Sequence, residues 1–135
     1  MASMAHAMGH ALGATLGLPH GRAVSLCLPY TIEFMARQAP ERAAQLATRT
    51  GISAAGGEQA ARTLAQAVRH LTTRVGNPLS LADSGVLRSV FESSLEKLVA
   101  DAENDTQMIT SSRSPSSQEL RKLFESIYEG TSVGF

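Results

Sequence analysis

The chain has 135 residues, enough for one compact domain. Twelve Lys and Arg side chains balance twelve Asp and Glu, so no net charge draws the protein to nucleic acid or to a membrane surface, and we expect neither as a partner. Aromatic residues make up only 4% of the chain and Trp is absent, so the core has to be built mainly from Ala, Leu and Val, a composition that favours closely packed helices.

The first predicted element is a helix over residues 3–16, rich in Ala, Met and Leu. Gly9 and Gly13 interrupt it, and glycine costs up to about 1 kcal/mol relative to alanine inside a helix. These two positions therefore indicate a close approach to the backbone, by another helix or by a ligand. The segment "GLPHG" at 17–21 then ends the helix, because Pro19 disfavours the α conformation at the preceding residue.

A second, almost wholly apolar helix is predicted over 22–38, buried on most sides. Pro29 is expected to kink it or to start a new helix. The only cysteine, Cys27, cannot form an internal disulfide, and we interpret it as a buried core thiol in a reducing compartment. No apolar run approaches the roughly 20 residues that span a bilayer, and no secretory signal is recognisable, so we expect a soluble, cytoplasmic chain.

Four more helices are predicted from apolar periodicity and from cap residues. Pro40 suits a first turn and Gly51 a C-terminal cap, Ser116 with Glu119 forms a capping box, and 103–117 shows no periodicity and is predicted to be a loop. The expected apolar faces contain Leu64, Val68, Leu71 and Val75, then Leu87, Val90, Phe91, Leu95, Leu98 and Val99, and finally Leu120, Leu123, Phe124, Ile127 and Tyr128. These helices cover 40–50, 58–75, 87–99 and 120–128, and a connection at 51–57 joins the first two. No segment shows the alternation of apolar and polar residues that is typical of a strand. The prediction is an all-α fold of about six helices, a single domain over 1–135.

Three of the four histidines fall within the first 20 residues. His6 and His10, four residues apart, share one face of the first helix, and His20 follows the proline break. Imidazole nitrogen is a good ligand for zinc or iron. The spacing alone leaves a core or interface role open, since such pairs also arise by chance and a catalytic site needs about three protein ligands. His70, at the rim of an apolar face, is interpreted as a solvated or interface side chain.

A long segment, "SMAHAMGHALGATLGLPHGRAVSLCLPYTIEF", closely resembles the signature of the iron-containing (group III) alcohol dehydrogenases, in which H-x3-H-x2-G on a helix is followed by "PHG". The segment "DAENDTQMITSSRSPSSQELRKLFESIYEG" is similar to the closing part of that family, with Ser114 inserted between its Arg and Pro. The resemblance implies the helical, metal-binding C-terminal domain of that family. It further implies His6 and His20 as metal ligands and His10 as the catalytic histidine beside the nicotinamide ring.

By the same resemblance the intact enzyme interconverts alcohols with aldehydes or ketones, using a divalent metal (iron or zinc) and NAD(P). The family's N-terminal nucleotide-binding domain, and the Asp and His that complete its metal site, have no counterpart here. We therefore expect an incomplete dehydrogenase without turnover by itself, and as possible partners either a chain supplying the N-terminal portion or a second copy bound to an uncovered apolar face. Two alternatives stay open: a non-catalytic helical assembly or binding module, and a new three-histidine site.

Overall fold

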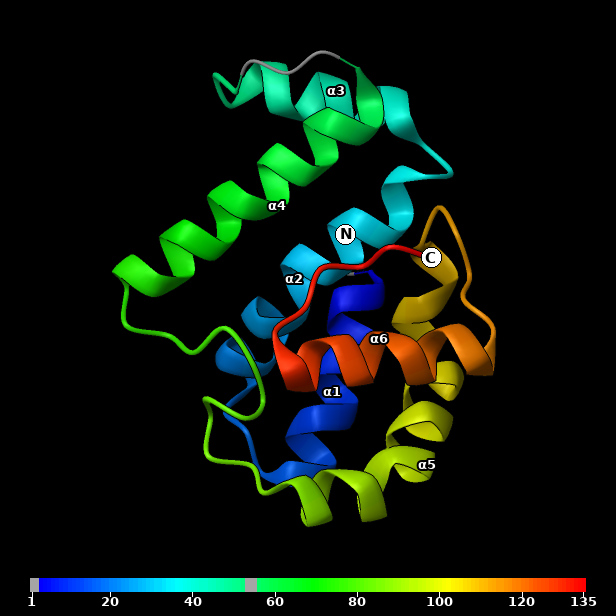
Figure 1. Ribbon diagram of the computed structural model, residues 1–135. Helices are drawn as coiled ribbons and strands as arrows, with labels where there is room; N and C mark the ends of the chain where they lie inside the picture. Colours follow the sequence, from blue (N-terminus) through cyan, green and yellow to red (C-terminus); the bar gives the residue numbers. More distant parts are fainter. Residues whose placement is uncertain (1–2, 53–55) are drawn as a thin grey trace.

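The computed structural model describes residues 3–52 and 56–135, and all regular secondary structure in these two ranges is helical, without a strand (Figure 1). The predicted all-α fold of about six helices is confirmed. None of the helices in the described ranges has both the length and the apolar character needed to cross a membrane. The elements are α1 Met4–Leu16, α2 His20–Ala36, α3 Pro40–Arg49, α4 Gly57–Arg74, α5 Arg88–Asn104, the 3-10 helix η1 Thr106–Thr110, and α6 Ser117–Glu129.

The turn between α1 and α2 is shorter than predicted. Gly17, with a φ of 71°, ends α1, and its N–H donates to the carbonyl of Gly13. Pro19 has a φ of −55°, already close to a helical value, and a proline needs no N–H partner at a helix start. The carbonyl of Pro19 accepts from the N–H of Ala23, so α2 begins at His20 rather than at Arg22. His20 is therefore held by a helix and not by the break.

Helix α2 is the central contact element of the fold. It continues through Pro29 as one helix, so of the two alternatives predicted at that proline the start of a new helix is wrong. It contacts α1, α3, α4 and α6, which confirms that it is buried on most sides. Cys27 is completely buried, as predicted, and burial raises the pKa of its thiol, because the apolar interior disfavours the thiolate.

The main hydrophobic core lies between α1, α2, α5 and α6, and α6 contacts α5 and α2. The α3–α4 pair stands outside this core and packs against α2. Its buried residues are mostly small, which allows the helices to approach closely: Ala47, Ala60, Ala61, Leu64, Ala65 and Thr72. The large, fully buried side chains of the main core are Met4, Met8, Leu12, Leu26, Tyr30, Phe34, Leu81, Phe91, Leu98, Leu120, Leu123 and Phe124.

Gly9 shows what approaches the backbone of α1. A Cβ built at this position would lie 2.7 Å from Val24 Cγ2 and 3.0 Å from the Cα and N of Val24. Of the two possibilities raised by the sequence, the close neighbour at Gly9 is thus another helix, α2, and not a ligand. At Gly13 the nearest atom is the carbonyl oxygen of Leu18, at 3.3 Å, which is a contact within the connecting turn.

Two predicted apolar faces are wrong at their ends. At the end of α4, Leu71 and the C-cap residue Val75 are 57% and 63% exposed, because the last turns face α2 with other residues: Thr72 is buried, and Arg69 lies over Tyr30 of α2. At the start of α5, Leu87 and Val90 are 68% and 45% exposed. The remaining apolar positions of α5 are buried as predicted.

The segment 103–117 is more regular than the loop predicted there. It contains the end of α5 and the 3-10 helix η1, whose first turn is capped by the Asp105 side chain accepting from the N–H of Gln107. A short 3-10 turn leaves no periodic apolar signal, which explains why the pattern missed it. The capping box of α6, made by Ser116 and Glu119, is confirmed in both of its hydrogen bonds.

A buried ion pair ties α2 to α4. Glu33 and Arg69 form a two-pronged contact with N–O distances of 2.6 and 3.0 Å, and their side chains are only 5% and 16% exposed. The Arg69 guanidinium also lies over the ring of Tyr30, 4.8 Å from its centroid. Glu33 Oε2 further accepts from the N–H of Val133, so the same carboxylate holds the C-terminal segment that follows α6.

Candidate metal-binding site

The three early histidines form one cluster. The ring centroids of His6 and His10 are 6.0 Å apart, those of His6 and His20 are 5.7 Å apart, and those of His10 and His20 are 5.3 Å apart. The His10 and His20 rings are stacked, whereas the other two pairs meet at steeper angles. All three candidate residues named from the sequence are thus brought together at the α1–α2 junction.

Backbone geometry explains this convergence. His6 and His10 lie one turn apart on α1, and α2 starts with His20 directly after a tight turn. The left-handed conformation at Gly17 reverses the chain, and Gly9 lets α2 pack closely against the α1 backbone. The cluster is therefore held by two packed helices and not by a mobile loop.

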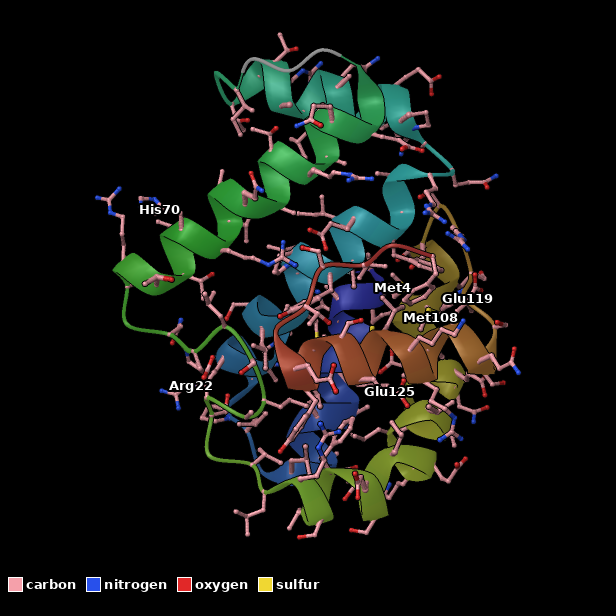
Figure 2. All side chains as sticks on the ribbon, in the orientation of Figure 1. Met4, Arg22, His70, Met108, Glu119 and Glu125 are labelled. Atoms are coloured by element: carbon pink, nitrogen blue, oxygen red, sulfur yellow. The ribbon has the colours of Figure 1, made fainter. Side chains whose placement is uncertain are left out.

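The fourth histidine is separate from the cluster. His70 lies on the outer side of α4, away from the main core (Figure 2). Its side chain is exposed, in agreement with the prediction of a solvated residue. It provides a natural control for experiments on the other three.

The carboxylate of Asp105 contacts the cluster from another part of the chain. Its Oδ2 lies 2.7 Å from Nδ1 of His10, and its Oδ1 accepts from the N–H of Gln107, also at 2.7 Å. Partial burial opposes ionisation, but the backbone N–H of Gln107 and the neighbouring His10 and His6 outweigh it, so the pKa of Asp105 is lowered. Asp105 is therefore an ionised acceptor placed against His10.

Sequence reasoning missed Asp105, which is 95 positions away from His10. The only available signal was the similarity of this segment to the closing part of the iron-type family, which pointed to an acidic helix end but to no single carboxylate. The nearby Asp101 does not substitute for it. Asp101 Oδ2 accepts from the Thr15 hydroxyl at 3.4 Å and pairs with Lys97 Nζ at 2.5 Å.

The donor set fits part of a divalent metal site. Among the described residues, His10 is the one member of the cluster whose ring makes a hydrogen bond, and the ring nitrogens of His6 and His20 are engaged by no donor or acceptor there. Neutral imidazole suits zinc or iron. However, no group of three or more His, Cys, Asp or Glu in the described ranges is arranged to hold a metal. This chain therefore offers a pair of imidazoles, which needs further ligands.

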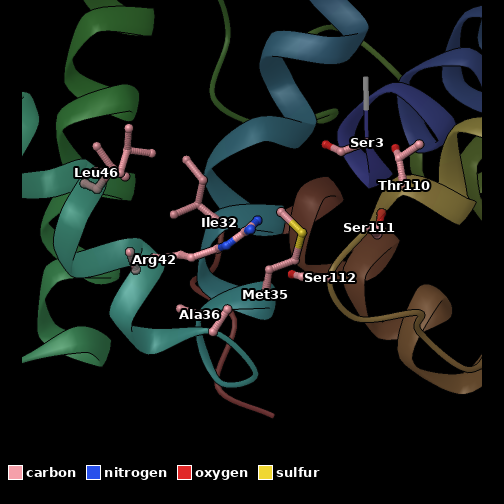
Figure 3. A pocket seen from close by; sticks show the side chains of 12 residues that line it. Ser3, Ile32, Met35, Ala36, Arg42, Leu46, Thr110, Ser111 and Ser112 are labelled. Atoms are coloured by element: carbon pink, nitrogen blue, oxygen red, sulfur yellow. The ribbon is translucent and has the colours of Figure 1, made fainter. Parts of the chain in front are cut away.

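An apolar pocket lies elsewhere in the described part of the chain. It has a volume of about 240 Å³ and lies between α2, α3 and the segment after α5, as Figure 3 shows. Ile32, Met35 and Leu46 line its apolar side, and Ser111 and Ser112 its polar side. None of the three clustered histidines lines this cavity, so it is not part of the candidate metal site.

Comparison with known proteins finds dehydrogenases that resemble this chain over its whole length or nearly so. The chain is 28% identical over 135 residues to the NADPH-dependent butanol dehydrogenase of Clostridium saccharobutylicum, covering 100% of this chain and 35% of that protein. It is 29% identical over 145 residues to the bifunctional aldehyde-alcohol dehydrogenase of Escherichia coli (strain K12), covering 95% of this chain and 16% of that protein.

Solved structures give the same result. The alcohol dehydrogenase from Oenococcus oeni superimposes with a TM-score of 0.80 at 29% identity, covering 93% of this chain and 32% of that one. A 1,3-propanediol oxidoreductase superimposes with a TM-score of 0.79 at 27% identity, with the same coverage of 93% and 32%. The chain thus spans about a third or less of the length of these relatives.

The profile described as "Fe-containing alcohol dehydrogenase family, C-terminal" matches residues 1–128, a range that includes the histidine cluster and all six α-helices apart from the last residue of α6. The chain belongs to this family and corresponds to its C-terminal helical part.

Proposed function

We propose that this chain is the metal-binding helical part of an NAD(P)-dependent dehydrogenase that interconverts alcohols with aldehydes or ketones. His6 and His20 hold a divalent metal, iron or zinc, and His10 lies beside the nicotinamide ring. The observation that carries the proposal is the convergence of three imidazoles at the α1–α2 junction, where no two ring centroids are more than 6.0 Å apart. The relatives named above as alcohol and butanol dehydrogenases support the reaction class.

Each histidine has a distinct task in this proposal. The metal, when bound, polarises the substrate oxygen and favours hydride transfer. His6 and His20 position that ion. When an alcohol gives its hydride to NAD(P)⁺, its hydroxyl proton also has to leave, and His10 receives it as a general base. In the reverse direction, His10 returns the proton to the oxygen of the reduced carbonyl.

The remaining ligands and the nucleotide-binding surface are proposed to lie outside these residues. A catalytic zinc or iron site needs about three protein ligands, and this chain offers two. A hydride carrier also needs a binding surface, and the described residues contain no strand to build a Gly-rich phosphate turn of the dinucleotide-binding type. We expect a further portion of the enzyme, on the same or a partner chain, to supply both. The chain alone is then without turnover.

Zinc titration tests the metal assignment directly. Zn²⁺ is redox-silent, so binding to the chain can be followed by calorimetry and by imidazole NMR signals. We expect the signals of His6 and His20 to respond first. Loss of a residue that only hydrogen-bonds to a metal ligand already weakens metal binding roughly tenfold or more. Replacing a ligand itself, in His6→Ala or His20→Ala, should weaken zinc binding by at least that factor.

The matched control is His70→Ala, which removes a solvated imidazole without touching the cluster. It should leave zinc binding unchanged. Equal zinc affinity in wild type, His6→Ala and His20→Ala would contradict the ligand assignment. Turnover of short-chain alcohols with NAD(P) by the purified chain, with iron(II) or zinc added, would contradict the proposal that a further portion of the enzyme supplies the other ligands and the nucleotide-binding surface.

A second candidate function is self-association of the helical part without catalysis. The observation in its favour is the exposure of Leu71 and Val75 at the end of α4 and of Leu87 and Val90 near the start of α5, since exposed apolar side chains that gather in a patch mark interaction surfaces. Sedimentation equilibrium distinguishes a monomer from a dimer of this chain. A dimer that dissociates in the paired variant Leu71→Gln/Val75→Gln supports this function, and a monomer at all concentrations removes it.

A further inference from the structure

Asp105 uses its two carboxylate oxygens for two different purposes. Oδ1 accepts from the backbone N–H of Gln107 and so caps η1, while Oδ2 faces Nδ1 of His10, both at 2.7 Å. A backbone N–H can only donate, so the orientation of the carboxylate is set by the cap. Oδ2 is left with a fixed direction, towards the imidazole.

We propose that Asp105 is the positioning residue of His10, and that it holds the ring in the tautomer with the proton on Nδ1. An ionised carboxylate can only accept, so the neutral ring must present Nδ1–H to it. The lone pair of His10 is then on Nε2. The catalytic meaning of this arrangement rests on the proposed function, because it makes Nε2 the atom that accepts the hydroxyl proton while the hydride leaves to NAD(P)⁺.

The surroundings of Asp105 favour a lasting contact. Its side chain is 17% exposed, whereas the His10 ring is 41% exposed. Water therefore reaches the His10 ring more easily than the Asp105 carboxylate. The hydrogen bond between them persists because the carboxylate that accepts it is held rigidly. That rigidity comes from the cap on η1 and from the packing of η1 against α1 and α5. The stacked ring of His20, 5.3 Å from His10, restricts the imidazole on another side.

Aspartate and asparagine should give opposite tautomers. In Asp105→Asn only one oxygen remains, and the Gln107 N–H requires it as the cap of η1. The side-chain NH₂ then faces Nδ1 of His10 and donates to it, so the proton of the neutral ring must move to Nε2. Asparagine is also a good N-cap residue, and for this reason the variant keeps the local backbone while reversing the polarity at His10.

The experiment is two-dimensional ¹H–¹⁵N NMR of the imidazole rings in the full chain at about pH 9, well above the ordinary histidine pKa of about 6.5. We expect His10 to be mainly the Nδ1–H tautomer in wild type and mainly Nε2–H in Asp105→Asn and in Asp105→Ala. The control Asp101→Asn removes a charge from the last turn of α5, four residues before Asp105 and next to Thr15 and Lys97, and should leave the tautomer of His10 unchanged.

A mainly Nε2–H ring in wild type overturns the proposal, whether or not the variants fold. Persistence of Nδ1–H in Asp105→Ala overturns it as well. Both readings concern this chain without metal or nucleotide, so they are separable from the proposed function. If zinc fails to bind at His6 and His20 while the tautomer inverts as expected, the dehydrogenase assignment fails and the positioning contact stands.

Discussion

The close approach of α1 and α2 at Gly9 gives a direct test of how the histidine cluster is held. Replacing this glycine by alanine adds one methyl group in a helix interior. Elsewhere in a helix this change is favourable by about 1 kcal/mol, because alanine has the better helix propensity. Here the new Cβ would lie 3.0 Å from the Cα and N of Val24 and 2.7 Å from its Cγ2.

The expected net effect is destabilising. Carbon contacts are optimal at about 3.5–4.0 Å, and because two of the three close atoms belong to the backbone, a rotation of the Val24 side chain cannot relieve the clash. Helix α1 has to shift away from α2. Overpacking of this kind costs about 1–3 kcal/mol, which exceeds the gain in propensity. We expect Gly9→Ala to lower the free energy of unfolding by about 1 kcal/mol, combining these two magnitudes.

Urea denaturation followed by circular dichroism measures this difference, provided that the slopes of wild type and variant agree. The matched control is Gly21→Ala at the start of α2, where a Cβ meets nothing within 4 Å. This control should be unchanged or more stable by up to about 1 kcal/mol. A Gly9→Ala chain as stable as wild type, or more stable, would refute the packing argument. The contact between Gly9 and Val24 also sets the distance between the helices that carry His6 and His20. Gly9→Ala should therefore weaken zinc binding as well.

Three further outcomes follow from the packing and the charges. Glu33→Gln should lower the free energy of unfolding by about 3 kcal/mol in urea titrations, because it leaves Arg69 largely buried without its partner. Cys27 should react with a thiol reagent only as fast as the chain unfolds, since burial both hides the thiol and raises its pKa. The N–H of Ser116, and then its hydroxyl and Arg113, lower the pKa of Glu119 below its ordinary 4.5, so its stabilising contribution is present above that value and is lost at lower pH. Between about pH 5 and pH 3 wild type should therefore lose more stability than Glu119→Gln.

Each of these outcomes has a control or a contradicting result. For the buried pair, the control is Glu129→Gln at the exposed contact with Arg88, which should change stability by less than about 1 kcal/mol. A loss as small for Glu33→Gln would show that the buried pair is not stabilising. Fast labelling of Cys27 in the native state, or parallel pH curves for wild type and Glu119→Gln, would contradict the other two.

Much of the fold followed from local signals in the sequence. The helices could be predicted where apolar spacing, cap residues and proline positions agreed, as in α6 with its capping box and in α1 up to Gly17. His6 and His10 could be grouped because four residues make about one helical turn. His20 joined them because the intervening break was short. These features depend on neighbours along the chain, and such neighbours are visible in the sequence.

Other features depended on which elements meet in space. The sequence could not show that the last turns of α4 bury Thr72 and leave Leu71 exposed, because an apolar repeat does not reveal which side of a helix its neighbour will contact. It left open whether Gly9 admits a helix or a ligand, and the position of Val24 decided for the helix.

The sequence by itself determined the helical class and the histidine motif, because these rest on spacing within single helices and turns. The family came from the resemblance of two long segments to known dehydrogenases. Only the tertiary structure decided that Asp105 faces His10 and that Glu33 pairs with Arg69. These partners lie 95 and 36 positions apart, and no local pattern encodes a pairing at such separation. Such a pairing forms only when segments that are distant in the sequence pack together and bring the two side chains within hydrogen-bond distance.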